Sequence, residues 1–150
     1  MILVVNGPNI NLLNEREKEF YGGISSDFIK KKLIEEARRD GEKIEWWQGN
    51  SQGEIIDHLQ KKRSDADGLI INPAAYSHTG LALLDCLKML EMPIIEVHIS
   101  NTAARSGGRP ERKELLTAQA AEGVIMGLGA KSYLLAYRAL KNLPGGNQGK

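Results

Sequence analysis

Short apolar segments separated by helical patterns leave this chain few ways to fold. Four of the segments are rich in Ile, Leu and Val and carry few polar residues, at positions 2–6, 68–72, 93–99 and 123–127. A fifth, at positions 43–48, has the pattern of a half-buried strand. Apolar strands of this length are typical of a parallel sheet that is covered on both faces.

The stretches between these strands predict helices. Apolar residues recur at helical spacing at positions 29–40, 54–64, 81–90 and 131–142. Strands that alternate with helices of this length indicate right-handed crossovers between parallel strands, because a crossover helix packs back onto its sheet in that hand. We therefore predict an α/β fold, a flavodoxin-like three-layer sandwich with a five-stranded parallel sheet.

Length and charge narrow the class of protein. The 150 residues suit a single domain over positions 1–150, with a flexible tail over about 142–150. Lys and Arg number 20 against 19 Asp and Glu, and the charges are interleaved along helix faces, so a nucleic-acid partner is not expected. No apolar run approaches the roughly 20 residues that span a bilayer. The single cysteine, Cys86, lies in an apolar helical pattern and is predicted to be a buried thiol. The protein is expected to be cytoplasmic and not associated with a membrane.

Polar residues follow each of the first four predicted strands. In open parallel sheets the ligand binds beyond the carboxyl ends of the strands, so these residues are candidates for one site. The connection at positions 7–23 is also much longer than the roughly 2–6 residues usual between a strand and a helix, and such loops are often functional. The four polar stretches are at positions 6–9, 48–51, 72–78 and 98–101.

A glutamate and a histidine interrupt the apolar strand IIEVH. Residues two apart on a strand point to the same face, so Glu96 can accept a hydrogen bond from one ring nitrogen of His98 and support protonation of the other. This arrangement favours His98 as a general acid or base. His58 lies in a helical pattern and is interpreted as a surface or structural histidine. Because His58, His78 and His98 stand on three different elements, without a CxxC or HExxH motif, no metal site is predicted.

The long first loop carries Arg16 and Tyr21. A tyrosine, with a pKa of about 10, is a poor base near neutrality unless a cation stabilises the phenolate, and Arg16 supplies such a cation. From composition alone the alternative is that Tyr21 is a hydrophobic clasp and Arg16 a solvated surface charge. A phosphate loop is not predicted at GLGAKS, positions 127–132, because Ala130 stands where that motif needs glycine before the lysine.

Five motifs in this sequence resemble those of type II 3-dehydroquinate dehydratases, and together they cover about residues 2–141. The resemblance implies a flavodoxin-like protomer that assembles as trimers into a dodecamer. It also implies dehydration of 3-dehydroquinate to 3-dehydroshikimate without a cofactor, in the shikimate pathway or in quinate breakdown. In chain order the motifs are NGPNINLLNEREKEFYGG, GNSQGEIIDHL, NPAAYSHTGLALLD, PIIEVHISN and GVIMGLGAKSYLLAYRAL.

The resemblance implies catalytic roles for five residues. Tyr21 would remove the α-proton of the ketone, and Arg16 would lower the pKa of that tyrosine. Asn9 would help to hold a water that stabilises the enolate. His98 would protonate the departing hydroxyl, and Glu96 would orient the imidazole of His98. These roles agree with the chemistry, because an α-proton is too weakly acidic to leave unless the enolate is stabilised.

The resemblance also implies a set of substrate-binding residues. Asp85 would reach the active site of the neighbouring subunit. Arg109 matches the family's later arginine, with Arg105 and Arg112 as alternatives in the same segment. The other binding residues implied are Asn72, His78, Ile99 and Ser100.

Departures from the family pattern keep other functions open. Four positions differ from the residues common in the family, namely Gln52, Ala74, Leu84 and Ala103, and the segment at positions 102–116 is unusual. This segment motivates a second reading, a relative that dehydrates another cyclic β-hydroxy ketone. A third reading is a flavodoxin-like module that binds a flavin or nucleotide, although the charged first loop lacks the expected Ser/Thr/Gly phosphate cradle.

Overall fold

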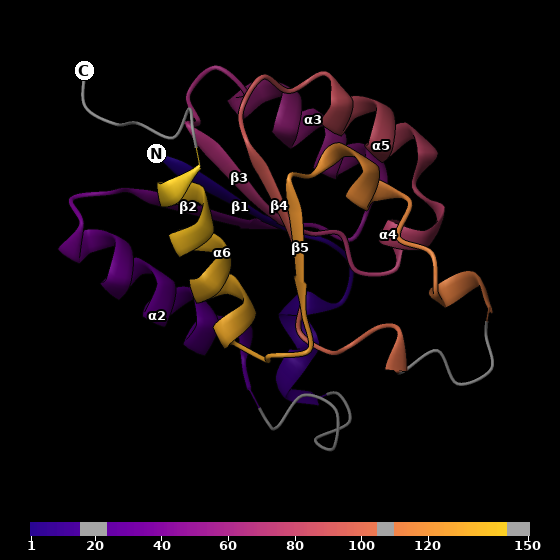
Figure 1. The fold of residues 1–150 in the computed structure, drawn as a ribbon, viewed down its shortest axis with the longest axis horizontal. Helices are drawn as coiled ribbons and strands as arrows, with labels where there is room; N and C mark the ends of the chain where they lie inside the picture. Colours follow the sequence, from indigo (N-terminus) through magenta and orange to yellow (C-terminus); the bar gives the residue numbers. More distant parts are fainter. Residues whose placement is uncertain (16–23, 105–109, 144–150) are drawn as a thin grey trace.

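The computed structural model describes residues 1–15, 24–104 and 110–143. Across these residues, five parallel strands form one sheet in the order β2-β1-β3-β4-β5 (Figure 1). This is the strand order of flavodoxin-like folds, so the predicted fold class is confirmed. The strands are β1 (Ile2–Asn6), β2 (Ile44–Gln48), β3 (Gly68–Asn72), β4 (Ile94–His98) and β5 (Gly123–Met126).

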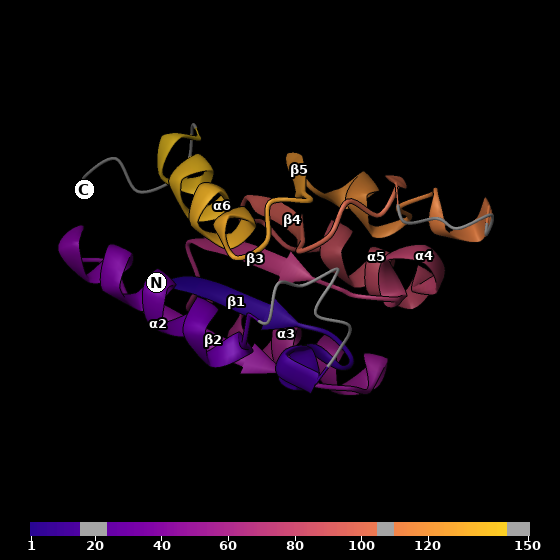
Figure 2. The ribbon, with the colours of Figure 1, turned by 90° about the horizontal axis from the view of Figure 1, so that it is seen from below.

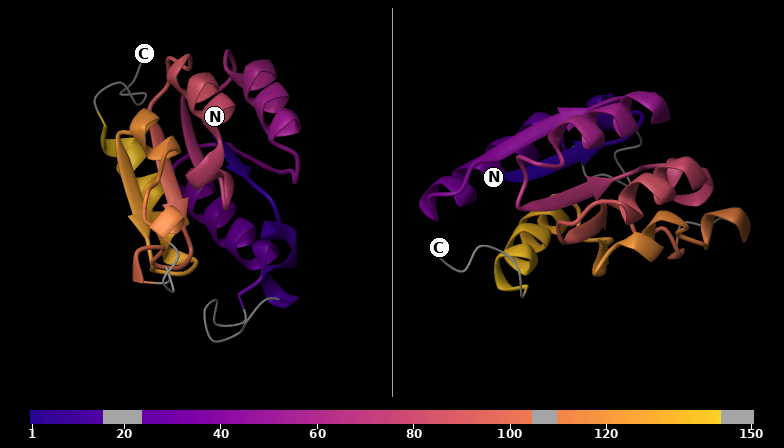
Figure 3. Two further views of the ribbon diagram at one scale, coloured as in Figure 1. Left: turned by 90° about the vertical axis from the view of Figure 1, so that its right-hand side faces the viewer. Right: turned by 90° about the horizontal axis from the view of Figure 1, so that it is seen from above.

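Helices cover both faces of the sheet. Figures 1 and 2 show α6 with α2 beside it on one face, and Figure 3 shows α3 and α5 on the opposite face. The α-helices are α2 (Ser26–Arg39), α3 (Gln52–Lys62), α4 (Tyr76–Thr79), α5 (Leu81–Lys88) and α6 (Lys131–Asn142). Three short 3₁₀ helices lie in the connections of the described chain, η1 (Ile10–Glu15), η3 (Pro110–Arg112) and η4 (Thr117–Ala120).

Local sequence signals explain where the elements begin. Helix α2 starts before its first periodic apolar residue because the Ser25 side chain accepts a hydrogen bond from the backbone N–H of Phe28 at 3.1 Å, which caps the helix. Strand β4 begins after Pro93, which has no N–H to donate to a ladder. Helix α6 occupies the residues that its pattern predicted.

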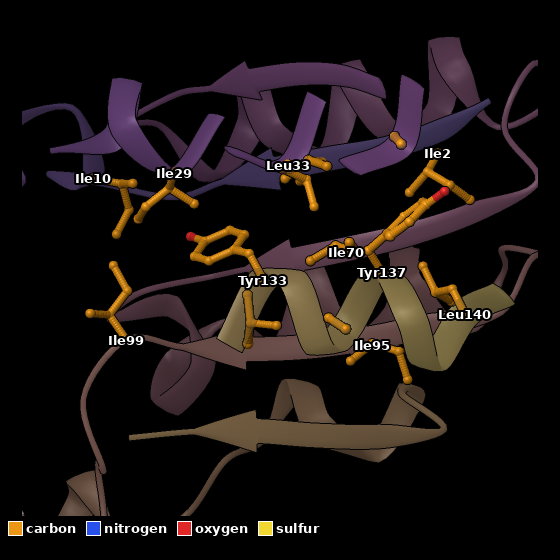
Figure 4. Packing of buried hydrophobic residues seen from close by; sticks show 14 of the residues in the cluster. Ile2, Ile10, Ile29, Leu33, Ile70, Ile95, Ile99, Tyr133, Tyr137 and Leu140 are labelled. Atoms are coloured by element: carbon orange, nitrogen blue, oxygen red, sulfur yellow. The ribbon is translucent and has the colours of Figure 1, made fainter. Parts of the chain in front are cut away.

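Alternate residues of each central strand feed two core layers. On β1, Val4 joins the layer beneath α2 and α6, whereas Leu3 and Val5 join the layer beneath α3 and α5. Figure 4 shows Tyr133 and Tyr137 pointing from α6 into the first of these layers. The second layer contains Cys86, so the predicted buried thiol is confirmed.

The edge strands are less buried than the central ones. Strand β2 is half-buried along its length, as its sequence predicted. Strand β5 was expected to be buried on both faces, but it is partly exposed and Val124 keeps 37% of its surface accessible. The reason is its place at the edge of the sheet, where β4 is its one neighbouring strand.

The register aligns the carboxyl ends of the strands. Asn6 at the end of β1 lies opposite Gln48 of β2 and Asn72 of β3. Polar side chains at three strand ends therefore meet at one rim of the sheet, where the sequence pattern predicted a candidate site. None of the helices in the described part of the chain has both the length and the apolar character needed to cross a membrane.

Candidate active site

A cavity opens at this rim, and five of the predicted site residues line it. They are Asn72, His78, His98, Ile99 and Ser100. The cavity measures about 110 Å³. Pockets for drug-sized ligands usually measure roughly 300–1,000 Å³. The space that the described residues enclose is smaller than this and suits a compact ligand.

His98 is held by a buried carboxylate. Its Nε2 lies 2.7 Å from Oε1 of Glu96, and the side chains are 6% and 0% exposed, respectively. The other carboxylate oxygen, Oε2, accepts a hydrogen bond from the hydroxyl of Thr117 at 2.7 Å. Because an ionised carboxylate can only accept, Nε2 carries a proton and Nδ1 is the nitrogen left for chemistry in the cavity.

His78 reaches the cavity from α4, which follows β3. Its Nδ1 lies 2.7 Å from the backbone oxygen of Glu114. A carbonyl oxygen can only accept, so Nδ1 donates and Nε2 is left to accept a hydrogen bond when the ring is neutral. His98 is thus held through Nε2, whereas His78 is held through Nδ1.

The amide of Asn72 is fixed by a buried hydrogen-bond network. Its Nδ2 donates to the hydroxyl of Tyr133 at 2.8 Å, and that hydroxyl donates to Oδ1 of Asn6 at 2.7 Å. Oδ1 of Asn72 accepts from the backbone N–H of Ala74 at 3.2 Å. Burial raises the pKa of Tyr133 above its usual range, so the phenol stays protonated and acts as donor and acceptor at once.

Two glycines anchor the loop that carries Ile99 and Ser100. The N–H of Gly127 donates to the backbone oxygen of His98 at 3.2 Å, and the N–H of Gly129 donates to that of Ile99 at 3.0 Å. Both glycines have positive φ, 85° and 60°, a conformation that other residues adopt at a cost. The GLGAKS segment is therefore a strand end followed by a helix start, as predicted, and it supports the cavity wall.

Comparison with known families identifies the chain. The family model for class II dehydroquinases matches residues 1–141. The chain belongs to the class II dehydroquinase family. Its polar strand ends and its Glu96–His98 pair thus belong to a dehydroquinase fold.

Individual members of the class II dehydroquinase family align along nearly the whole chain. A 3-dehydroquinate dehydratase of Aliarcobacter butzleri is 42% identical over 142 residues, which cover 95% of this chain and 85% of the relative. One from Clostridium botulinum is 40% identical over 141 residues, 94% of each chain. The crystal structure of type II dehydroquinase from Butyrivibrio crossotus superposes with a TM-score of 0.89 at 36% identity, covering 94% of this chain and 97% of that one.

Other residues predicted from the family resemblance are not in the cavity lining or fall outside the described residues. Asn9 is exposed, with a φ of 67°, and its backbone N–H donates to Oδ1 of Asn50 at 3.1 Å. Asp85 is exposed on α5. Tyr21, Arg16 and Arg109 fall outside the described residues.

The dehydroquinase cavity has further lining residues that were not among the predicted site residues. Arg112, which was an alternative to Arg109, lies in the lining with Ile10, Ala74, Ala75 and Thr102. Ala74, one of the departures from the family pattern, has a φ of 51°, a conformation that glycine adopts at less cost. In an L-residue this left-handed conformation costs roughly 1–2 kcal/mol.

The histidines do not gather into a metal-binding group. Across residues 1–15, 24–104 and 110–143, no three side chains of His, Cys, Asp or Glu come together as metal ligands would. His58, interpreted as surface or structural, lies on α3 and stacks on Trp47 with ring centroids 4.5 Å apart. Its role in the structure is therefore packing against β2.

Proposed function

We propose that this protein dehydrates 3-dehydroquinate to 3-dehydroshikimate by a cofactor-free acid–base elimination through an enolate. The observation that carries the proposal is the buried pair of Glu96 and His98 at a small cavity shared with His78 and Asn72, in a member of the class II dehydroquinase family. Dehydration of a β-hydroxy ketone needs a base for the α-proton, stabilisation of the enolate and an acid for the leaving hydroxyl.

His98 is the proposed acid. With Nε2 bound to Glu96, the proton that can be transferred is the one on Nδ1. As the carbon–oxygen bond breaks, this proton passes to the hydroxyl, which leaves as water, and the ring double bond forms. The negative charge of Glu96 stabilises the imidazolium that precedes this step.

The base and the enolate stabiliser come from the first loop. Tyr21 takes the α-proton as a phenolate, and Arg16 lowers the pKa of that phenol by its positive charge. Asn9 helps to hold the water that binds the enolate oxygen. These three assignments rest on the family resemblance of the NGPN and EREKEFYGG segments.

Substrate binding is assigned to the cavity wall. Asn72, His78 and the Ile99–Ser100 loop provide hydrogen-bonding groups in the cavity lining. Arg112 lines the same cavity and adds a guanidinium, which suits the carboxylate of 3-dehydroquinate because the two groups can form paired hydrogen bonds. Arg109, which the family resemblance assigned to this role first, lies outside the described residues and is the other candidate.

The proposal extends to assembly and location. Dodecamers built of trimers are expected, and the exposed carboxylate of Asp85 on α5 is then available to a neighbouring subunit's active site. Light scattering would test this by measuring the mass in solution, with a trimer or monomer as the contrary result. The cytoplasmic location stays a prediction.

Ultraviolet absorbance on mixing the protein with 3-dehydroquinate tests the function, because the product is a conjugated enone and the substrate is not. We expect turnover that persists with a metal chelator and after borohydride is added in the presence of substrate, since no imine is formed. Absence of turnover, with turnover of another cyclic β-hydroxy ketone, would instead support the second reading. A flavin module would purify with a yellow chromophore.

A further inference from the structure

Thr117 is a buried polar residue that none of the functional assignments above uses. It begins η4, its side chain is inaccessible to solvent, and its hydroxyl lies 2.7 Å from Oε2 of Glu96. Glu96 is equally inaccessible, and His98 binds its other oxygen. The hydroxyl and the imidazole are thus the two side-chain hydrogen-bond partners of this carboxylate within the described residues.

We propose that Thr117 is a positioning residue for the dehydration, acting on His98 through Glu96. This inference rests on the proposed function. The terminal torsion of a glutamate side chain is broad, so a carboxylate bound through one oxygen can turn about it. A hydroxyl on Oε2 removes that freedom and keeps Oε1 facing Nε2 of His98, so that the imidazole presents Nδ1 for proton transfer.

The backbone around Thr117 is itself held against the active site. The N–H of Leu116 donates to the backbone oxygen of Ser77 at 2.6 Å, and the carbonyl of Glu114 accepts from Nδ1 of His78 at 2.7 Å. Residues 114–117 therefore contact both cavity histidines, His78 directly and His98 by way of Glu96. These hydrogen bonds tie residues 114–117 to α4 and to β4. They hold the Thr117 hydroxyl within hydrogen-bonding distance of Glu96.

Removing the hydroxyl also leaves a buried oxygen with one partner fewer. A buried acceptor that loses its donor costs roughly 1–3 kcal/mol in stability, and a purely structural role for Thr117 would show this effect alone. The positioning role adds a specific kinetic effect. It predicts a fall in kcat without a matching change in KM, because His98 acts on the leaving hydroxyl after the substrate is bound.

The test compares Thr117→Val, which keeps the shape and deletes the hydroxyl, with Thr117→Ser, which keeps the hydroxyl. We expect Thr117→Val to lower kcat by roughly 10- to 100-fold, by analogy with the loss of hydrogen-bond partners that orient metal-ligating side chains. KM should stay within about twofold, and Thr117→Ser should recover most of the wild-type kcat. If Thr117→Val does not fold, Thr117→Ala and Thr117→Ser still differ by the hydroxyl alone and make the same comparison.

A double-mutant cycle with Glu96→Met, which removes both carboxylate oxygens and keeps a side chain of similar length, tests the route of the effect. If Thr117 acts through Glu96, Thr117→Val should cost much less in the Glu96→Met background than in the wild type. Independent, multiplying losses would overturn the proposal, as would a folded Thr117→Val with wild-type kcat. Failure of the wild-type protein to turn over 3-dehydroquinate is a separate result, which would contradict the proposed function first.

Discussion

Nε2 of His98 lies 2.7 Å from Oε1 of Glu96, and both side chains are buried on the same face of β4. The pleat of the strand creates this pair, since residues two apart point the same way. Its position at the carboxyl end of a central strand brings the imidazole to the cavity while the carboxylate stays inaccessible to solvent. The sheet itself therefore holds together the carboxylate and the imidazole that we propose as the acid.

Glu96→Gln removes the charge of this pair and keeps its shape. The amide can still accept from His98 and donate to the Thr117 hydroxyl, so the fold should be retained. We expect kcat to fall by about 10²-fold, because the imidazolium loses its counter-charge, with little change in KM. Steady-state assays of enone formation by ultraviolet absorbance measure kcat and KM, and circular dichroism checks the fold. A variant with wild-type kcat would remove Glu96 from the mechanism.

Tyr21→Phe deletes the proposed base. We expect a loss of at least about 10²- to 10⁴-fold in kcat, the usual contribution of general base catalysis. Arg16→Ala should leave the phenol in place but move the rise of the pH–rate profile to higher pH, since the phenolate loses its stabilising cation. Normal turnover by Tyr21→Phe would contradict the assignment of the base, whereas an unshifted profile for Arg16→Ala would contradict only the role of the arginine.

Arg112→Ala and Arg109→Ala form a matched pair that locates the carboxylate contact. Arg112 lines the cavity, so its loss should raise KM by about tenfold or more, as expected for one charge-assisted hydrogen bond of roughly 1.5–3 kcal/mol. Arg109→Ala should change KM by less. The reverse ranking of the two variants would restore the assignment that the sequence suggested.

Tyr133→Phe removes the hydroxyl shared by Asn6 and Asn72. Two buried amide groups then lose a partner, so the free energy of unfolding should fall by about 2–3 kcal/mol, measured by urea denaturation. KM should rise because the Asn72 amide is no longer fixed. Tyr137→Phe is the control, since its hydroxyl binds Asp40, whose side chain is 43% exposed. If Tyr133→Phe and Tyr137→Phe changed KM equally, the network would not position Asn72.

His58 predicts a pH dependence of stability. Burial against Trp47 lowers the pKa of His58 from its ordinary value of 6.5, although Glu45 opposes the shift. The folded state therefore binds the proton less readily than the unfolded chain does. Stability that is present above pH 6.5 is lost as the pH falls through the folded-state value. In His58→Phe, which keeps a ring against Trp47, the urea midpoint should fall less between about pH 7 and pH 5. Parallel curves for both proteins would contradict this account.

The fold was predictable because its signals are local. The strand pattern over positions 2–6 and the helix pattern over 131–142 each depend on residues a few positions apart, and both elements form there. Edge position is not a local property, which is why β5 proved more exposed than its apolar sequence suggested. The parallel arrangement of the strands followed from their alternation with helices, because such crossovers are right-handed.

The same distinction separates the parts of the site. The pairing of Glu96 with His98 could be read from the chain, because two positions on a strand share a face by geometry alone. Thr117 joins Glu96 across 21 positions and Tyr133 joins Asn6 across 127, and no periodicity connects residues so distant. The presence of Arg112 in the cavity likewise depends on the path of a loop. Contacts of this kind form only once the chain has packed. The tertiary structure therefore decided which residues hold the side chains of the proposed site in place.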